Sequence, residues 1–310
     1  MKVAVTGASG LIGSALVTHL RQQGHEVFRF VRRPAGAADE RPWNPSAPPD
    51  SATFDGMEGV VHLAGRNIAA ARWSAAQKEE ILASRVGGTR SLAESFALNG
   101  RKPAVLVTAS AIGIYGDRGD EMLTESSAPG TGFLADVVQQ WEQATQAAAR
   151  AGVRTVCLRF GVVLSAHGGA LPRMLPPFRA GLGGRVGSGR QWMSWIDLHD
   201  AVSLIAFALQ NPQLHGPVNA VAPNPVRNSE FTRALGEQLH RPTLFPLPAA
   251  VVKVLLGEMG RELLLASQRV QPVVAQAAGF RFTYPELRGA LQHVLAPTAA
   301  QPSTARTSAP

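Results

Sequence analysis

The 310-residue chain contains a single cysteine, Cys157, and this scarcity excludes a fold held together by internal disulfides. Cys157 lies in the apolar run Val153 to Leu158, which predicts a buried, unreactive thiol. The chain also lacks any stretch of about 20 consecutive apolar residues, so no membrane-spanning helix is predicted. Because no apolar leader precedes the first strand, we expect a cytoplasmic protein without a membrane partner.

Clustered positive charge is also scarce, although the net charge is +8. The arginines are scattered along the chain, whereas a nucleic-acid surface typically combines a basic patch with aromatic residues. The histidines show no spacing typical of metal ligands. We therefore predict neither a nucleic-acid partner nor a metal site.

What the chain does contain is an alternation of short apolar strands and helical patterns. The expected strands are 2–6, 26–31, 59–65 with its turn, 103–110, 154–160 and 216–221. The expected helices are 11–23, 74–99, 132–151 and 195–210, and 34–54 is expected as a loop with at most one short strand. Right-handed crossovers place helices on both faces of such a sheet. The sequence thus predicts an α/β fold with a doubly wound, mostly parallel Rossmann sheet.

The composition changes after Leu164, and this change predicts how the chain is divided. Residues 168–189 are rich in Gly, Pro and Arg, so we expect a loop excursion, 165–193, that contributes to the substrate side. Residues 1–222 are predicted to form the Rossmann domain and 223–296 a small C-terminal substrate lobe. Residues 297–310 are Ala, Pro, Ser and Thr in the main and predict a disordered tail.

A glycine loop follows the first strand and is the strongest functional signal in the sequence. Gly7 suits a tight turn, Gly10 lets the backbone approach a pyrophosphate, and Gly13 lets the helix pack closely on the sheet. The free N–H groups of the following helix favour phosphate, which predicts a dinucleotide site. This site comprises Gly7, Ser9, Gly10, Leu11, Ile12 and Gly13.

The end of the second strand distinguishes NAD from NADP(H). An acidic residue there accepts the ribose hydroxyls of NAD, but this chain has Arg32 and Arg33. A guanidinium pairs well with a 2′-phosphate, so these residues predict NADP(H) as the cofactor. Two solvated arginines on a loop are the alternative interpretation.

Further motifs resemble those of the short-chain dehydrogenase/reductase superfamily, in its extended, epimerase-like branch. They are residues 6–13 (TGASGLIG), 62–65 (HLAG), 109–116 (ASAIGIYG), 158–164 (LRFGVVL) and 195–200 (WIDLHD). More narrowly, the chain is similar to the atypical epimerase-family (sugar-nucleotide-epimerase-like) oxidoreductases with a C-terminal domain of unknown function. The marks of that subfamily are Ser84-Arg85-Val86 with Thr89, Trp141-Glu142, Gly187-Ser188-Gly189, Gly257-Glu258, Gly279-Phe280 and Tyr284-Pro285. The resemblance covers nearly all of residues 2–296.

The resemblance implies roles for residues outside the glycine loop. Ser110 ends its strand where the superfamily holds the substrate oxygen, and a hydroxyl that caps its own turn is the alternative. Arg85 stands where the superfamily often has an asparagine. Arg85 and Arg159 are also candidate anchors for a substrate carboxylate or phosphate, and hydrogen bonds to backbone carbonyl oxygens are the alternative for Arg159. The implied cofactor contacts are Leu63, Ala64 and Gly65 on the adenine and ribose side, the backbone after Arg159 near the nicotinamide, and Arg85 and Ala109.

The proton relay typical of the superfamily is missing. Active members use a Tyr-x-x-x-Lys pair on one helix face, where the ammonium lowers the pKa of the tyrosine. The only tyrosines are Tyr115 and Tyr284, and neither has a lysine four residues later. The implied positions of the pair fall near Leu134 and Val138. Tyr115 is the remaining candidate acid, and a packing role is its alternative.

Two hypotheses of different class therefore stay open. One is an NADP(H)-dependent oxidoreductase for an unknown small carbonyl or sugar-like substrate, with Ser110 and Tyr115 as catalytic residues. The other is a non-catalytic regulatory or scaffold protein that binds NADPH, for example in cell division, a label that some relatives carry. A plain epimerase with tightly held NAD is disfavoured by Arg32 and Arg33. The sequence leaves monomer and homodimer open.

Overall fold

A seven-stranded parallel sheet forms the centre of the molecule in the computed structural model, which describes residues 1–47, 52–98 and 102–296. The strands lie in the order β11-β7-β5-β4-β1-β2-β3. Their bounds are β1 Lys2–Thr6, β2 Glu26–Val31, β3 Glu40–Pro42, β4 Gly59–His62, β5 Val105–Ala111, β7 Arg154–Phe160 and β11 Gly216–Ala220. The strand order reverses between β1 and β4, and in such sheets ligands bind at the carboxyl ends beside the reversal.

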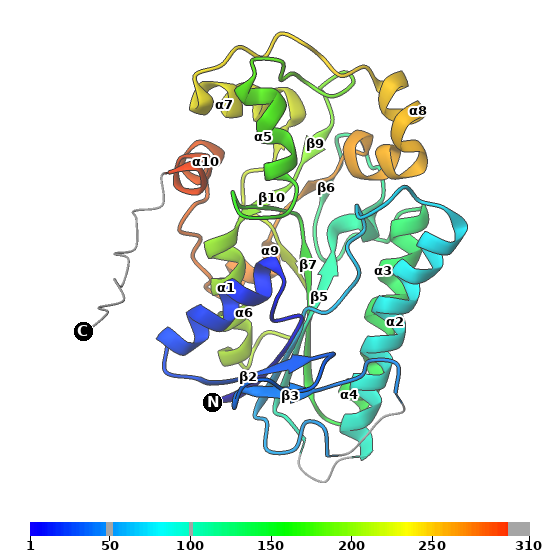
Figure 1. Ribbon diagram of the computed structural model, residues 1–310, viewed down its shortest axis with the longest axis vertical. Helices are drawn as coiled ribbons and strands as arrows, with labels where there is room; N and C mark the ends of the chain where they lie inside the picture. Colours follow the sequence, from blue (N-terminus) through cyan, green and yellow to red (C-terminus); the bar gives the residue numbers. More distant parts are fainter. Residues whose placement is uncertain (48–51, 99–101, 297–310) are drawn as a thin grey trace, which may run out of the picture.

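Helices cover both faces of the sheet (Figure 1), which confirms the predicted doubly wound α/β class. On one face lie α1 (Leu11–Gln22) and α6 (Leu198–Gln210), which contact each other, and on the other lie α2 (Ala75–Leu98), α3 (Phe133–Gln143) and α4 (Gln146–Arg150). Neighbouring residues of β1 alternate between the two cores. Val3 and Val5 pack on the α1 side and Ala4 on the α2 side. A strand buried on both faces explains the uninterrupted apolar sequence.

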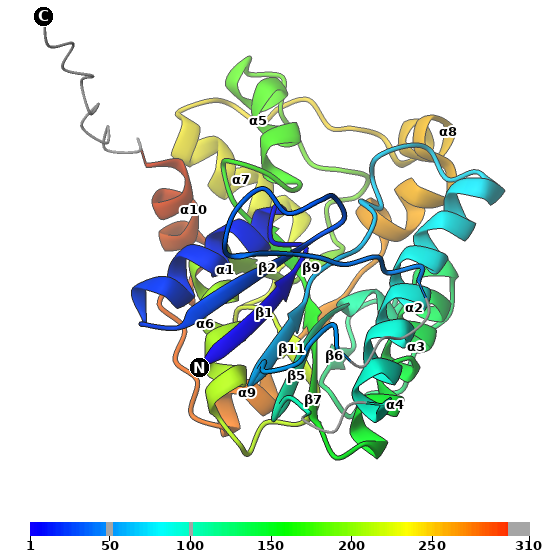
Figure 2. The same cartoon turned by 60° about the horizontal axis from the view of Figure 1, so that its bottom comes forward.

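Most of the remaining elements lie above the carboxyl ends of the strands, as Figure 2 also shows from a second side. Their bounds are η1 Ile112–Tyr115, β6 Met122–Leu123, β8 Val162–Leu164, α5 Leu171–Arg179, β9 Trp192–Met193, β10 Trp195–Asp197, β12 Val226–Arg227, α7 Asn228–Leu239, α8 Ala249–Gly260, η2 Arg261–Leu265, β13 Arg269–Val270, α9 Val273–Ala277 and α10 Leu287–Leu295. Strand β12 pairs with β9 and β13 with β6, so backbone pairing joins the last third of the chain to earlier segments. The domain boundary at residue 222 stays a prediction.

The predicted strands and helices are found, with three corrections. The excursion 165–193 contains the helix α5 in spite of Pro176 and Pro177, because Leu171, Leu175 and Phe178 bury one helix face. Residues 195–197 form β10, and the helix expected there begins at Leu198, capped by Asp197. The helix expected over 132–151 is divided into α3 and α4. Residue 99 and the predicted tail 297–310 lie outside the described residues.

Cys157 lies buried in β7, as predicted. Burial raises the pKa of its thiol to about 12, so the reactive thiolate is scarce at neutral pH. None of the helices in the described ranges is long and apolar enough to cross a membrane.

Candidate functional site

The glycine loop joins β1 to α1 and brings separate backbone segments into close contact. Gly7 has a φ of +69°, and a Cβ atom there would lie 2.7 Å from the carbonyl carbon of Leu63. A Cβ atom at Gly13 would lie 2.2 Å from the carbonyl oxygen of Gly7. Only glycine fits at either position, so α1 begins directly against the loop and the β4 turn lies beside it.

The N-terminus of α1 is open to a ligand. Its N-cap residue, Gly10, offers no side-chain acceptor, and the first turn contains no acidic residue. A Cβ atom at Gly10 would have a single neighbour within 4 Å, the Gly7 oxygen at 3.3 Å. The first N–H groups of a helix have no acceptor within the helix, and its dipole favours negative charge. Gly10, the exposed Ser9 and the amides of Leu11 and Ile12 therefore fit a dinucleotide pyrophosphate.

The excursion after β8 reaches this loop. A Cβ atom at Gly168 would lie 3.2 Å from Leu11 Cδ1, and one at Gly169 would lie 3.3 Å from Leu11 Cδ2. Residues 168–169 therefore lie against the Leu11 side chain, next to the predicted dinucleotide site.

Arg85 extends from α2 toward the turn that contains Leu63, Ala64 and Gly65. A Cβ atom at Gly65 would lie 3.7 Å from Arg85 Cζ, and the guanidinium lies over the Trp141 ring, 5.2 Å from its centroid. Arg85 donates to the Ile81 carbonyl oxygen at 3.3 Å, and no carboxylate of the described residues pairs with it. Burial lowers its pKa to about 10. A desolvated guanidinium without a carboxylate is suited to an anionic group of a cofactor or substrate.

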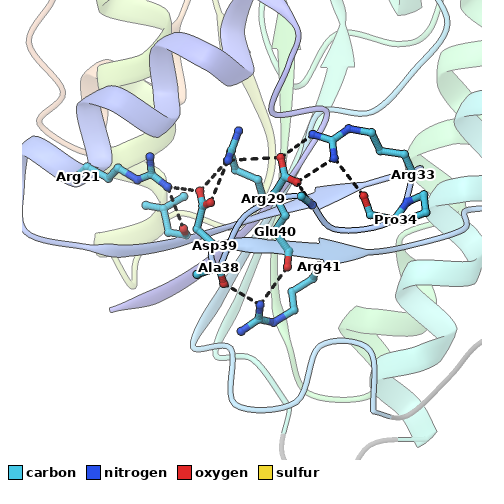
Figure 3. Close-up of polar contacts among 10 residues, drawn as sticks. Arg21, Arg29, Arg33, Pro34, Ala38, Asp39, Glu40 and Arg41 are labelled. Carbon is cyan, nitrogen blue, oxygen red and sulfur yellow. Dashed lines mark hydrogen bonds and ion pairs between the residues drawn. The ribbon is translucent and has the colours of Figure 1, made fainter.

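Arg32 and Arg33 follow β2 directly, but two carboxylates that the sequence analysis missed lie with them (Figure 3). Glu40 of β3 accepts hydrogen bonds from Arg33 at 2.7 and 2.9 Å, and Asp39 accepts two from Arg29. Arg32 is exposed and makes no hydrogen bond or ion pair with another described residue. The sequence did predict at most one short strand in the loop 34–54. This strand is β3, and its pairing with β2 places Glu40 opposite Arg29, so it could have indicated that these acids lie beside the arginines.

Ser110 lies near the end of β5 in a buried network of charged side chains. Its hydroxyl donates to Glu142 Oε1 at 2.6 Å, and Arg159 on the neighbouring strand donates to both Glu142 oxygens at 2.8 Å. Ser110 is only 4% exposed and Arg159 only 6%. Glu142 of α3 already neutralises the Arg159 guanidinium, so an Arg159 anchor for a substrate carboxylate or phosphate would have to exchange this partner, and that role stays a prediction.

Tyr115, in η1, belongs to the same network and is fully buried. Its phenol accepts a hydrogen bond from Arg159 at 2.9 Å and donates to Asn219 Oδ1 at 2.7 Å. Burial raises the pKa of the phenol, so it stays protonated at neutral pH. Both candidate hydroxyls have partners within the protein, and a direct catalytic role for Ser110 or Tyr115 stays a prediction. Ala109, the predicted cofactor contact beside Ser110, is half-buried.

The positions where the resemblance implies Tyr-x-x-x-Lys are filled by packing residues of α3. Leu134 lies against Gly113, where a Cβ atom would be 3.2 Å from Leu134 Cβ. Val138 is buried in a cluster with Ile112 and Ile114. Helix α3 instead contributes Glu142, which the sequence analysis noted as a family mark without a role. Among the described side chains, no group of three or more His, Cys, Asp or Glu is placed to hold a metal ion.

Two family profiles match most of the chain. The NAD dependent epimerase/dehydratase family matches residues 3–221, which include the glycine loop and the buried network. A domain of unknown function (DUF1731) matches residues 247–294, in the last third of the chain. The two matches follow one another along the chain.

Individual proteins are similar over nearly the whole length. An epimerase family protein of Mycobacterium bovis is 46% identical over 290 residues, which cover 93% of this chain and 96% of that protein. The crystal structure of human epimerase family protein SDR39U1 with NADPH is 34% identical, has a TM-score of 0.88, and matches 95% of this chain and 99% of that one. A nucleoside-diphosphate sugar epimerase from Corynebacterium glutamicum is 38% identical, with a TM-score of 0.79, over 95% of this chain and 58% of that one.

Proposed function

The chain belongs to the NAD dependent epimerase/dehydratase family, and from this premise we propose that it is an NADP(H)-dependent oxidoreductase for a small carbonyl or sugar-like compound. The observation that carries the proposal is the open N-terminus of α1 together with the arginines at the end of β2. The human relative crystallised with NADPH supports the cofactor assignment.

NADP(H) supplies a hydride donor or acceptor at its nicotinamide ring. In this chain the amides of Leu11 and Ile12 would hold the pyrophosphate, and Arg32 and Arg33 the 2′-phosphate. Leu63, Ala64 and Gly65 would line the ribose side, with Arg85 above them. Ala109 and the backbone after Arg159 would lie toward the nicotinamide.

For Ser110 and Tyr115 we propose that they orient the substrate oxygen. In the structure Ser110 donates to Glu142 and Tyr115 to Asn219, so each hydroxyl has to exchange an internal partner for the substrate. Removing a hydroxyl that contacts the substrate lowers kcat, whereas removing one that only supports the network lowers stability. Ser110→Ala and Tyr115→Phe should therefore lower kcat about 100-fold, the range typical of a general acid or an orienting donor.

The first experiment is NADPH oxidation by the purified protein against a panel of carbonyl compounds and nucleotide sugars. Turnover that Gly10→Asp abolishes supports the proposal, because an aspartate at the N-terminus of α1 places a carboxylate against the pyrophosphate. Tight NADPH binding without turnover of any compound would speak against an oxidoreductase.

A second candidate is a protein that binds NADPH as a regulatory ligand and does not turn it over. The observation that favours it is the packing of Leu134 and Val138 where the relay pair is implied, together with the burial of both candidate hydroxyls. In a deletion strain, Ser110→Ala and Tyr115→Phe should then restore the lost function as well as the wild type. Gly10→Asp should not restore it. Failure of all three variants would support the enzyme instead.

A further inference from the structure

We propose that Glu40 is a positioning residue for the 2′-phosphate of NADP(H), and that it acts by holding the Arg33 guanidinium in place. The proposal rests on the cofactor proposed above. Under this proposal Glu40 helps the protein to distinguish NADP(H) from NAD. Glu40 is an acid and does not contact the phosphate itself, because it acts through the arginine that binds the phosphate.

Glu40 is a buried carboxylate with three donors around it (Figure 3). Its side chain is only 3% exposed, and it accepts hydrogen bonds from Arg33 at 2.7 and 2.9 Å and from the Gly36 amide at 2.8 Å. Arg29 lies 3.3 Å away on the neighbouring strand. The Gly36 amide and the Arg33 guanidinium hold the pKa of Glu40 below its usual range, so it is ionised at neutral pH. The single carboxylate of Glu40 therefore holds both the backbone of the loop 33–39, at Gly36, and the side chain of Arg33.

The contacts of Arg33 leave a defined pair of donors free. Nη1 donates to Glu40 and to the Pro34 carbonyl oxygen, and one hydrogen of Nη2 goes to Glu40. A guanidinium has five N–H groups, so the Nε hydrogen and the second Nη2 hydrogen remain. These two lie side by side and form the fork that binds two oxygens of a phosphate. Since the Arg33 side chain is 60% exposed, this fork is accessible.

Arg29 and Arg32 do not offer the same fork in a fixed position, and Arg41 lies apart from Arg33, with its Nη1 donating to the Ala38 and Glu40 carbonyl oxygens (Figure 3). Arg29 uses both Nε and Nη2 on Asp39, which also pairs with Arg21. Arg32 is exposed and without a partner among the described residues, so it adds charge but is not held in one orientation. Arg33 is thus the arginine that Glu40 sets in advance for a phosphate, and preorganisation of this kind increases affinity.

Replacing Glu40 by glutamine separates positioning from simple charge, because the two effects have opposite signs. Loss of a negative charge near the phosphate strengthens phosphate binding by electrostatics alone. Loss of the bond that holds Arg33 weakens it. We expect the second effect to win, since hydrogen bonds between charged groups are short-range and contribute more than screened charges at the surface.

The experiment measures Kd by isothermal titration for adenosine 2′,5′-bisphosphate and for adenosine 5′-monophosphate, which differ by the 2′-phosphate alone. Glu40→Gln should bind the bisphosphate about 10-fold more weakly and the monophosphate unchanged, so the preference for the 2′-phosphate falls. Asp39→Asn is the matched control. It removes the same charge from the next residue without touching Arg33, and its preference should stay at the wild-type value or rise.

Each result supports or overturns one statement. If the wild type shows no preference for the bisphosphate, the proposed cofactor is wrong. If the wild type prefers the bisphosphate and the folded Glu40→Gln variant has the same or a greater preference, the proposed role of Glu40 is wrong. In Arg33→Lys, which keeps the charge and loses the fork, adding Glu40→Gln should no longer weaken bisphosphate binding, because Glu40 acts through Arg33. The double variant should bind as tightly as Arg33→Lys or slightly more tightly, since only the charge effect of Glu40 remains. If Glu40→Gln does not fold, Glu40→Asp replaces it, and a wild-type preference in that variant would overturn the proposal.

Discussion

Gly13 and Gly87 are both helical glycines, and their surroundings predict opposite effects of the same substitution. A Cβ atom at Gly13 would lie 2.2 Å from the Gly7 oxygen, whereas one at Gly87 would have no neighbour within 4 Å. Gly13→Ala should displace the glycine loop, destabilise the protein by about 2–3 kcal/mol and weaken NADPH binding more than 10-fold. Gly87→Ala should stabilise α2 by about 0.5–1 kcal/mol. Urea unfolding and NADPH titration check both, and normal NADPH binding by Gly13→Ala would contradict the assigned role of the loop.

The buried His62 should make the stability of the folded protein fall at acidic pH. The ring is fully buried, its Nδ1 lies 2.7 Å from Thr6 Oγ1, and burial lowers its pKa to about 4. The unfolded chain binds a proton near pH 6.5 and the folded protein only near pH 4, so stability is complete above the first value and falls between the two. The loss is about 3 kcal/mol.

Urea unfolding of His62→Gln at neutral pH and near pH 4.5 measures this contribution. The pH-dependent loss should be about 2–3 kcal/mol smaller than in the wild type, because the variant has no ring to protonate. His167→Gln, at an exposed histidine, should keep the wild-type dependence. An equal loss in the wild type and in His62→Gln would rule out His62 as the source.

At the scale of elements, helix α3 owes its N-terminal cap to a distant segment. Its N-cap residue, Gly132, has no side chain, and Glu262 of η2 accepts hydrogen bonds from the Phe133 and Leu134 amides at 2.9 and 2.8 Å. A carboxylate there satisfies two free N–H groups and faces the positive end of the helix dipole. Since α3 also supplies Glu142, the cap supports the helix that holds the buried network.

Glu262→Gln should therefore destabilise the protein by about 1 kcal/mol, since the amide satisfies one N–H group and loses the charge. Glu94→Gln, at an exposed glutamate of α2, is the control and should change stability by less than about 0.5 kcal/mol. Urea unfolding of both variants is the measurement. Equal stability of the two would show that the cap contributes nothing.

For the whole molecule, cofactor binding should appear as added stability, because the proposed contacts come from several strands. A ligand that binds only the folded state at about 100 times its Kd adds about 2.7 kcal/mol. NADPH should therefore raise the Tm by several degrees, and NADH at the same concentration by clearly less. Thermal unfolding with each cofactor tests this, and an equal rise with NADH would contradict the assignment of the arginines.

The last third of the chain is held to the helices beside the central sheet by polar contacts. Lys78 of α2 pairs with Glu258 of α8 at 2.9 Å, and Asp200 of α6 accepts hydrogen bonds from the Thr283 and Tyr284 amides. The composition predicted helices in this region, and it held no information on these contacts. Both partners in each pair are ordinary polar residues separated by more than 80 positions.

The sequence alone determined the elements whose cause is local. Apolar runs predicted the strands, helical spacing predicted α1 and α2, and the glycines at 7, 10 and 13 predicted the dinucleotide loop, because turn geometry and burial pattern are written in consecutive residues. Its errors were local as well. Prolines suggested a loop over 168–189, but the burial of Leu171, Leu175 and Phe178 outweighs them in α5.

Only the tertiary structure decided how the charged groups are used. The sequence does not distinguish the environments of Arg33, Arg85 and Arg159. In the structure Arg33 pairs with Glu40, and Arg159 pairs with Glu142. Arg85 pairs with no carboxylate of the described residues. The environment of a charge depends on which strand or helix packs against it, and that packing joins residues far apart in the chain. The sequence predicted that the cofactor is NADP(H), whereas only the structure showed which of these guanidinium groups pair with a carboxylate of the described residues and which do not.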